Sequence, residues 1–430
     1  MSAPLGEDTA VDARVVRRAT LRLVPLLILL YLVNYLDRVN VGFAALTMNA
    51  DLGLSATVFG LGAGLFFIGY FIFEVPSNLA LHRYGARRWI ARIMVSWGVL
   101  AVMQALIAGS TSLYILRFAL GVAEAGFFPG IILYLTYWFP AERRGRIVAL
   151  FMAAIPVSTA LGAPIGGLLL KLDGALGLHG WQWLFIIEGL PTILIGLLVL
   201  KVLPDSPRDA QWLNPAERDL VATAVQVENE DKKRLHGTSL RAALTPRVAV
   251  LSFVYFTIIF GLYGLGFWMP TIVKKRLSIT DDLVVTLLTA APYAVGVVAI
   301  IVWGRYVDRR GGGAKLTALP LAVGGIAVAA TALVAAPWIG YAGLCVCAVA
   351  VMASFPGFWR LPTALFTGVA AAAGIAVVNS FGNLAGFVGP YWVGWMTDLF
   401  GDARWGLISI GAVMLTGAAV VMATSRNARA

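Results

Sequence analysis

The chain has 430 residues, of which 60% are hydrophobic and 13% are charged, and its mean hydropathy is +0.84. A soluble domain of this size would need more charged residues to cover its surface, so the composition excludes a water-soluble fold. The net charge of +11 does not indicate nucleic-acid binding, because the basic residues lie in short segments between long apolar runs.

The apolar runs have the length of a helix that spans a bilayer, about 20 residues. The first six helices are expected near residues 22–47, 56–81, 89–108, 112–138, 146–170 and 181–203. Six more are expected near residues 248–272, 284–307, 315–336, 338–365, 368–397 and 404–425. The sequence therefore predicts an all-α membrane protein with twelve transmembrane helices in two six-helix bundles.

A long polar segment separates the two sets of helices. We expect a first bundle over residues 1–203, a cytoplasmic linker over 204–247 and a second bundle over 248–430. Within the linker, Asn214 is followed by Pro215, an order typical of a helix that begins with Asn214 as its cap. A short surface helix is therefore predicted to start there.

The distribution of basic residues predicts the orientation, because Lys and Arg are enriched in cytoplasmic loops. If the amino terminus is cytoplasmic, the loops on the opposite side hold only Lys171, Lys274, Lys275, Arg276 and Arg404. Most of the 33 Lys and Arg residues then lie on the cytoplasmic side. We therefore expect a multi-pass protein of the inner (plasma) membrane with both termini in the cytoplasm.

The first predicted helix has one polar face within an apolar sequence. Four residues at helical spacing form this face: Tyr31, Asn34, Tyr35 and Arg38. Asp37 lies one step around the helix from it. Ionisable side chains at bilayer depth are costly unless they face protein or a water-filled cavity. These residues are therefore candidates for a functional site, and the alternative is a buried Asp–Arg pair that only joins helices.

The fourth predicted helix carries a second arginine and a second acid, Arg117 and Glu124, on nearly the same face. Two helices of one bundle with this composition are expected to line a shared cavity. Arginine offers a planar fork that matches a carboxylate, so Arg38 and Arg117 are candidates for holding an anion. Asp37 and Glu124 can gain or lose a proton as an anion arrives, which is the requirement for proton coupling.

Other polar residues in the predicted helices leave alternatives open. Asn379 and Asn383 share a face of the eleventh helix and either bridge helices or bind substrate hydroxyls. Glu74 and Arg360 are expected to contact the aqueous boundary. Glu188 in the sixth helix could take either role. Three aromatic residues are expected in the cavity wall or at the membrane interface: Tyr263, Trp268 and Trp359.

The sequence lacks the motifs of enzymes and metal sites. Its three histidines, at 82, 179 and 236, fall in or beside loops and form no pair with metal-ligand spacing. Cys345 and Cys347 lie in one apolar run and are expected to be small buried side chains. We therefore predict no catalytic residues, no metal and no cofactor.

Several stretches together are highly specific for one family. They are residues 35–42, 73–78, 87–89, 117–129, 181–183 and 379–383. Through these stretches the chain resembles the anion:cation symporter family of the major facilitator superfamily along nearly its whole length. One departure is His82, at a loop position where the superfamily commonly has Asp; Asp308 retains that residue in the second half.

The resemblance implies proton-driven uptake of an organic acid by alternating access. It places Arg38 and Arg117 around the substrate carboxylate and gives Asp37 and Glu124 to the protons. The relatives closest in appearance are bacterial tartrate-type carriers, with phthalate, hydroxyphenylacetate, nicotinate and sugar-acid permeases beside them. We count Tyr35, Asn379 and Asn383 with the two arginines as expected substrate-binding residues.

The expected function is therefore symport of protons with a small mono- or dicarboxylate such as tartrate. The expected partners are this anion, protons and the lipid bilayer, with the protein as a monomer and without nucleic acid. Two alternatives stay open. The same residues allow efflux or exchange of an anion, and a membrane receptor could bind the anion without transporting it.

Overall fold

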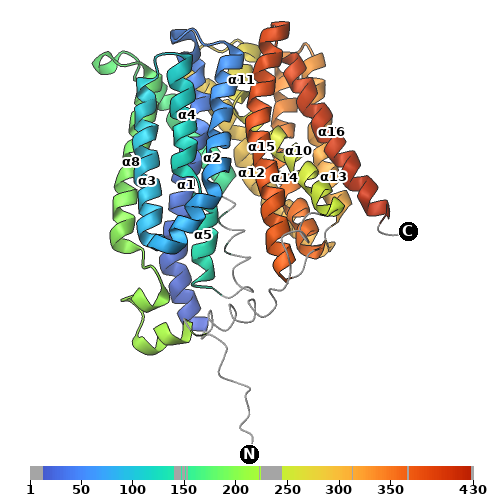
Figure 1. The fold of residues 1–430 in the computed structure, drawn as a ribbon. Coiled ribbons are helices and arrows are strands. Elements are labelled where there is room, and N and C mark those ends of the chain that lie inside the picture. Colours follow the sequence, from blue (N-terminus) through green and yellow to red (C-terminus); the bar gives the residue numbers. More distant parts are fainter. Residues whose placement is uncertain are drawn as a thin grey trace, which may run out of the picture.

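The computed structural model describes residues 13–139, 147, 151, 154–221, 223, 245–311, 313–365 and 368–427, and no residue among these lies in a strand. The helices of the first bundle are α1 (Ala13–Asp51), α2 (Ala56–Tyr84), α3 (Ala86–Met103), α4 (Ser110–Glu124), α5 (Phe127–Thr136), α7 (Ala154–Leu170) and α8 (Gly180–Val202). Those of the second are α10 (Pro246–Gly266), α11 (Met269–Leu277), α12 (Asp282–Arg309), α13 (Ala314–Leu333), α14 (Pro337–Leu365), α15 (Gly368–Phe400) and α16 (Arg404–Asn427). Each predicted segment therefore contains a helix (Figure 1).

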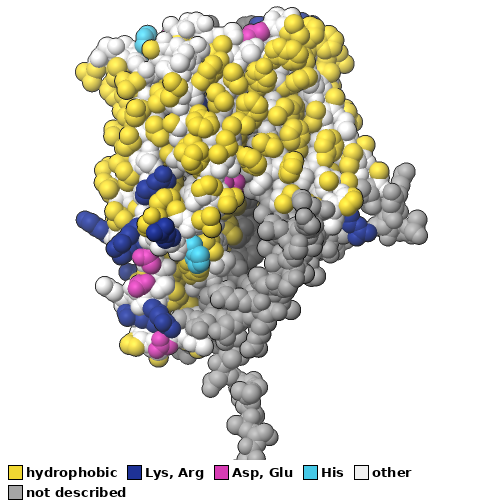
Figure 2. Space-filling view, in the orientation of Figure 1, with side chains coloured by type: hydrophobic (Ala, Val, Ile, Leu, Met, Phe, Trp, Pro, Cys, Tyr) yellow, Lys and Arg dark blue, Asp and Glu magenta, His cyan; other side chains and the backbone are white. Residues whose placement is uncertain are grey.

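The helices have the length and composition of membrane spans. Ten of the described helical segments are long and apolar enough to cross a bilayer. Figure 2 shows hydrophobic side chains covering a broad belt of the molecule, with Lys and Arg gathered below the belt. We call the end of the bundle where α1 begins the terminal face, and the end where α1 stops at Asp51 the distal face.

The fourth predicted helix is interrupted in the structure. We expected one helix over 112–138, but α4 ends at Glu124 and α5 begins at Phe127. Gly126 between them has φ 83°, a left-handed conformation that glycine adopts without the strain of a side chain. The break places the carboxylate of Glu124 at the end of α4, deep in the first bundle.

The two bundles contact each other at the distal face. The carboxylate of Asp398 on α15 accepts hydrogen bonds from the amides of Ala56 and Thr57 at the start of α2, at 3.1 and 2.7 Å. Lys171 after α7 forms an ion pair with Asp281 before α12 at 3.2 Å. These contacts close the distal face in this conformation.

The Lys171–Asp281 pair is insensitive to pH over the physiological range. The backbone amide of Leu283 and then the ammonium group of Lys171 hold the pKa of Asp281 below its ordinary value. Because this pKa is lowered, Asp281 stays ionised at every pH above the ordinary pKa of an Asp side chain. It is protonated only when the pH falls through the lowered pKa. Protonation of Asp281 therefore does not open the distal face near neutral pH.

Helices α2 and α15 pack against each other at the centre of the molecule (Figure 1). Glycine residues allow their close approach. A Cβ atom added to Gly64 of α2 would lie 2.8 Å from the carbonyl oxygen of Phe387 on α15. Because that neighbour is backbone, the helices themselves must separate to admit a side chain. The distal contact between the bundles therefore depends on the absence of a side chain at this position.

We expect Gly64→Val to weaken distal closure. Overpacking of this kind costs about 1–3 kcal/mol, which shifts the ratio of closed to open molecules about 5- to 150-fold. Spin labels at Leu176 and Thr280, in a variant without the native cysteines, would report a longer distance across the distal face. Gly304→Val is the matched control, because the nearest atoms there, of Pro356, lie 3.7 Å away. An unchanged distance distribution in Gly64→Val would contradict the closure argument.

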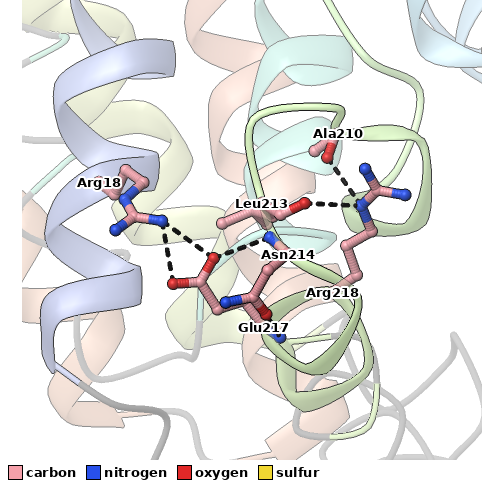
Figure 3. A network of polar contacts seen from close by, with 6 residues as sticks. All are labelled: Arg18, Ala210, Leu213, Asn214, Glu217 and Arg218. Atoms are coloured by element: carbon pink, nitrogen blue, oxygen red, sulfur yellow. Dashed lines mark hydrogen bonds and ion pairs between the residues drawn. The ribbon is translucent and has the colours of Figure 1, made fainter.

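The start of the linker packs against the first bundle (Figure 3). Arg18 on α1 binds both carboxylate oxygens of Glu217 at 3.0 Å. Asn214 and Glu217 exchange side-chain to backbone hydrogen bonds of 2.8 and 2.9 Å, and residues 215–221 are helical. The predicted helix start at Asn214 is thus confirmed. Arg218 completes the turn by donating to the carbonyl oxygens of Ala210 and Leu213.

Candidate substrate and proton site

Arg38 connects the two bundles at mid-depth. Its Nη2 atom forms an ion pair with Oε1 of Glu124, and its Nη1 atom donates to the hydroxyl of Tyr263 on α10 at 3.4 Å. Arg38 is 9% exposed and Glu124 is fully buried. The structure thus brings together two of the predicted site residues and adds Tyr263, which the sequence left between a cavity wall and an interfacial anchor.

Aromatic rings surround the guanidinium group of Arg38. Its Cζ atom lies 5.2 Å from the ring centroid of Phe66, 5.3 Å from that of Tyr70 and 5.9 Å from that of Tyr35. Cations are attracted to the faces of such rings, most strongly away from water. Phe66 and Tyr70 were missed in the sequence, because an aromatic residue in an apolar helix looks the same whether it packs or binds.

Arg117 shares the ring of Phe66 with Arg38, and its Cζ atom lies 5.1 Å from that centroid. Its side chain is fully buried, and within the described part of the chain none of its three guanidinium nitrogens has a hydrogen-bond partner. A buried cation without an acceptor is costly, by several kcal/mol. Arg117 therefore carries an unmet requirement for an anion.

A small cavity lies beside Arg38, between the bundles. Its volume is about 20 Å³, enough for a water molecule but not for an organic acid. The lining residues come from both bundles and are Tyr35, Val39, Phe43, Thr159, Leu262, Tyr263, Gly266, Phe267, Thr289 and Tyr293. Tyr35 and Tyr263 therefore connect Arg38 with the cavity, whereas Arg117 lies behind Phe66 and does not line it.

Asn379 and Asn383 lie on α15, away from the charged cluster. Both are partly exposed, and they share a helix face with Gly386, which packs against Phe67 of α2. That face therefore looks toward the first bundle. Among the described residues, neither amide has a hydrogen bond to Arg38 or Glu124, and neither asparagine lines the cavity.

Asp37 belongs to a different layer from Arg38. It is 1% exposed, and its Oδ2 atom accepts hydrogen bonds from Trp97 Nε1 at 2.6 Å and Thr192 Oγ1 at 3.1 Å. The simple Asp–Arg pair that the sequence offered as an alternative is absent from the described contacts, because Arg38 pairs with Glu124. Asp37 faces α3 and α8 instead.

The remaining polar candidates lie nearer the terminal face. Arg360 forms an ion pair with Asp308 at 2.8 Å, and both side chains are exposed. Glu74 is partly exposed. Cys347 is buried and Cys345 is half-buried, and neither forms a disulfide. Arg360 and Cys347 thus occupy the kinds of environment that the sequence predicted, whereas Cys345 is less buried than expected.

Residues 27–390 match the Major Facilitator Superfamily. The chain belongs to this superfamily. It is 47% identical over 419 residues to an Agrobacterium vitis protein named "Putative tartrate transporter", which covers 97% of this chain and 92% of that protein. A "Quinolone resistance transporter" of Acinetobacter baumannii is 42% identical over 404 residues, or 94% of this chain and 93% of that protein.

The solved structures of this superfamily share the fold. A bacterial homologue of the human lysosomal transporter Spinster, in an inward-facing and unoccupied conformation, matches with a TM-score of 0.79 and 18% identity. The match covers 96% of this chain and 98% of that one. The likeness confirms the predicted major facilitator fold, and the relatives confirm the resemblance to the transporters of organic acids. The protein is a membrane transporter.

Proposed function

We propose that the protein carries a small organic acid anion, such as tartrate, across the membrane together with protons. The observation that carries this proposal is Arg117, a fully buried guanidinium group without an acceptor among the described residues. A carboxylate is the group that best matches such a planar fork. The name of the Agrobacterium vitis relative supports a hydroxydicarboxylate as the anion.

Transport would proceed by alternating access between two rigid units, residues 1–203 and 248–430, joined by the linker 204–247. The distal face is closed here by α2 against α15 and by the Lys171–Asp281 pair. The anion would therefore exchange through the terminal face in this conformation. The excess of basic residues on that side supports a cytoplasmic terminal face, with both termini in the cytoplasm and the protein a monomer in the inner membrane.

Glu124 would couple the proton to the anion by competing for Arg38. In the structure the carboxylate of Glu124 forms an ion pair with the guanidinium group of Arg38. A substrate carboxylate that binds Arg38 would displace Glu124 and leave it buried without a cation, where protonation is favoured. Anion binding and proton binding would then support each other. The hydrogen bond between Arg38 and Tyr263 would transmit a change of partner at Arg38 to the second bundle.

Uptake into proteoliposomes tests the proposal. We expect radiolabelled tartrate to accumulate when the lumen is more alkaline than the bath, and the accumulation to disappear when a protonophore collapses the gradient. Liposomes without protein are the control. Flux of the anion that is indifferent to the pH gradient would remove the coupling claim, and binding without flux would favour a receptor.

Efflux is the second candidate, and the Acinetobacter baumannii relative favours it by its name. In that case a fluoroquinolone should move against its gradient in inverted vesicles energised with protons, and tartrate should not compete. Competition between the two compounds would instead indicate one shared site. Counterflow in preloaded vesicles would separate exchange from either net direction.

A further inference from the structure

We propose that Glu188 on α8 is a third carboxyl group for proton coupling, beside Glu124 and Asp37, and that it shares a proton with Asp37 on α1. The proposal rests on the proton-coupled function above and assigns a residue to it. In this arrangement the proton is held in a layer between α1, α3 and α8, and the anion is held on the other side of α1, at Arg38.

Two helices are joined through these acids and two short polar side chains. Asn40 Nδ2 of α1 donates to Glu188 Oε2 at 3.0 Å. Thr192 Oγ1 of α8 lies 3.1 Å from Asp37 Oδ2 and 3.3 Å from the carbonyl oxygen of Glu188. Asp37 and Asn40 are three residues apart on α1, and Glu188 and Thr192 are four apart on α8, so each pair shares a helix face. The two carboxyl groups are near enough that a negative charge on one disfavours a negative charge on the other.

The site has unused hydrogen-bonding capacity away from water. Asp37 and Asn40 are each 1% exposed. Glu188 is a partly exposed residue, but its Oε1 atom is buried. Within the described part of the chain, three oxygens have no hydrogen-bond partner: Asp37 Oδ1, Asn40 Oδ1 and Glu188 Oε1. Each of these acceptors could receive a hydrogen bond from a protonated carboxyl group or a water molecule.

No described cation neutralises either acid through an ion pair. The helix α7 carries no ionisable residue, and the basic residues of α3, at 87, 88 and 92, lie in its first turns near the terminal face. On α1 the nearest cation is Arg38, which pairs with Glu124 of α4. Lys201 of α8 lies at the terminal end of that helix. Asp37 and Glu188, joined through Asn40 and Thr192, therefore have no counter-ion among the described ion pairs.

Two neighbouring carboxylates in such a place favour a shared proton, because desolvation and mutual repulsion both oppose a second negative charge. One proton from the aqueous side would form an O–H bond on either acid and leave the pair with one negative charge. Its release on the opposite side would break that bond and restore the second charge. Asp37 and Asn40 flank Arg38 on α1. Protonation or deprotonation of the two acids would therefore affect anion binding at Arg38 through this helix.

Glu188→Gln tests the assignment. Glutamine resembles the protonated acid, so the variant should still exchange one labelled anion for another, within about twofold of the unmodified protein. Accumulation driven by an imposed pH gradient should fall at least 10-fold, and the pH dependence of uptake should flatten. Glu217→Gln is the control, because its carboxylate binds the exposed Arg18 far from this site, and it should keep both the accumulation and the pH profile. Gradient-driven accumulation by Glu188→Gln with an unchanged pH profile would overturn the proposal.

A second variant covers the case in which Glu188→Gln does not fold. Thr192→Val keeps the shape of the side chain and removes the hydroxyl that bonds Asp37. Since the carboxylate of Asp37 loses a donor, the midpoint of the uptake pH profile should move to higher pH while the maximal exchange rate is kept. A profile identical to that of the unmodified protein would count against the shared-proton site. If the unmodified protein moves no anion at all, the proposed function fails, and that outcome is visible before any variant is made.

Discussion

Replacing Arg117 with Lys should lower anion transport about 10- to 150-fold, because a lost hydrogen bond to a charged group costs about 1.5–3 kcal/mol. Lysine keeps the positive charge but is a compact point charge without the planar fork. Arg117 has no other described partner that a lysine could use, so the loss should fall on the anion. Initial rates of tartrate uptake and tartrate binding by calorimetry would both measure it.

The matched control for Arg117→Lys is Arg92→Lys. Arg92 also lies over an aromatic ring, with its Cζ atom 4.7 Å from the centroid of Trp89, but it sits near the start of α3. Its replacement should leave transport within about twofold. If Arg117→Lys is folded and transports tartrate at the rate of the control variant, Arg117 is a structural residue. Its unpaired guanidinium group then no longer supports the proposed function.

Replacing Glu124 with Gln should lower the stability of the protein, and binding of the anion should restore that stability. Breaking a buried ion pair by removing one partner costs about 3–5 kcal/mol, and here it leaves Arg38 without its carboxylate. A bound anion can supply the missing charge, and a ligand that binds only the folded protein stabilises it by mass action. Thermal unfolding should therefore show a lowered transition temperature and a larger upward shift with tartrate than the unmodified protein shows.

Transport by Glu124→Gln should separate exchange from accumulation. Exchange of labelled for unlabelled anion should persist, because Arg38 remains available, whereas a pH gradient should no longer drive accumulation. Glu217→Gln is the matched control: its carboxylate binds an exposed Arg18, and such surface pairs contribute about 0–1 kcal/mol. A Glu124→Gln variant with the stability of this control would contradict the role of the buried pair.

The arrangement of helices could be predicted from the sequence because the bilayer imposes a length on every apolar run. The interruption of the fourth helix could not be predicted. Glycine and proline, present here at Gly126 and Pro129, also occur within continuous helices, and the tertiary packing decides whether the helix breaks. The cap at Asn214 could be predicted because it depends on neighbours within four residues. These cases separate local chemistry, which one sequence contains, from packing between distant segments.

The ionisable residues of the candidate site could be identified from the sequence, but their pairing could not. Asp37 and Arg38 are adjacent in sequence, yet their side chains leave α1 in directions about 100° apart. Arg38 consequently meets Glu124, and Asp37 meets Trp97 and Thr192. Glu188 had a visible signal, an acid within an apolar run, but its relation to Asp37 depends on the contact between α1 and α8.

The charged chemistry of the described interior lies in one bundle alone. The buried ionisable residues are Asp37, Arg38, Arg117 and Glu124, whereas the buried polar residues of the second bundle are serine and threonine hydroxyls. Aromatic residues such as Tyr263 and Tyr293 complete its side of the cavity. Substitutions in the second bundle could therefore change which substrate is transported, while the ionisable residues of the first bundle that couple transport to protons are kept. Chimaeras that exchange second bundles between relatives should inherit the donor's cargo and keep the recipient's response to protons.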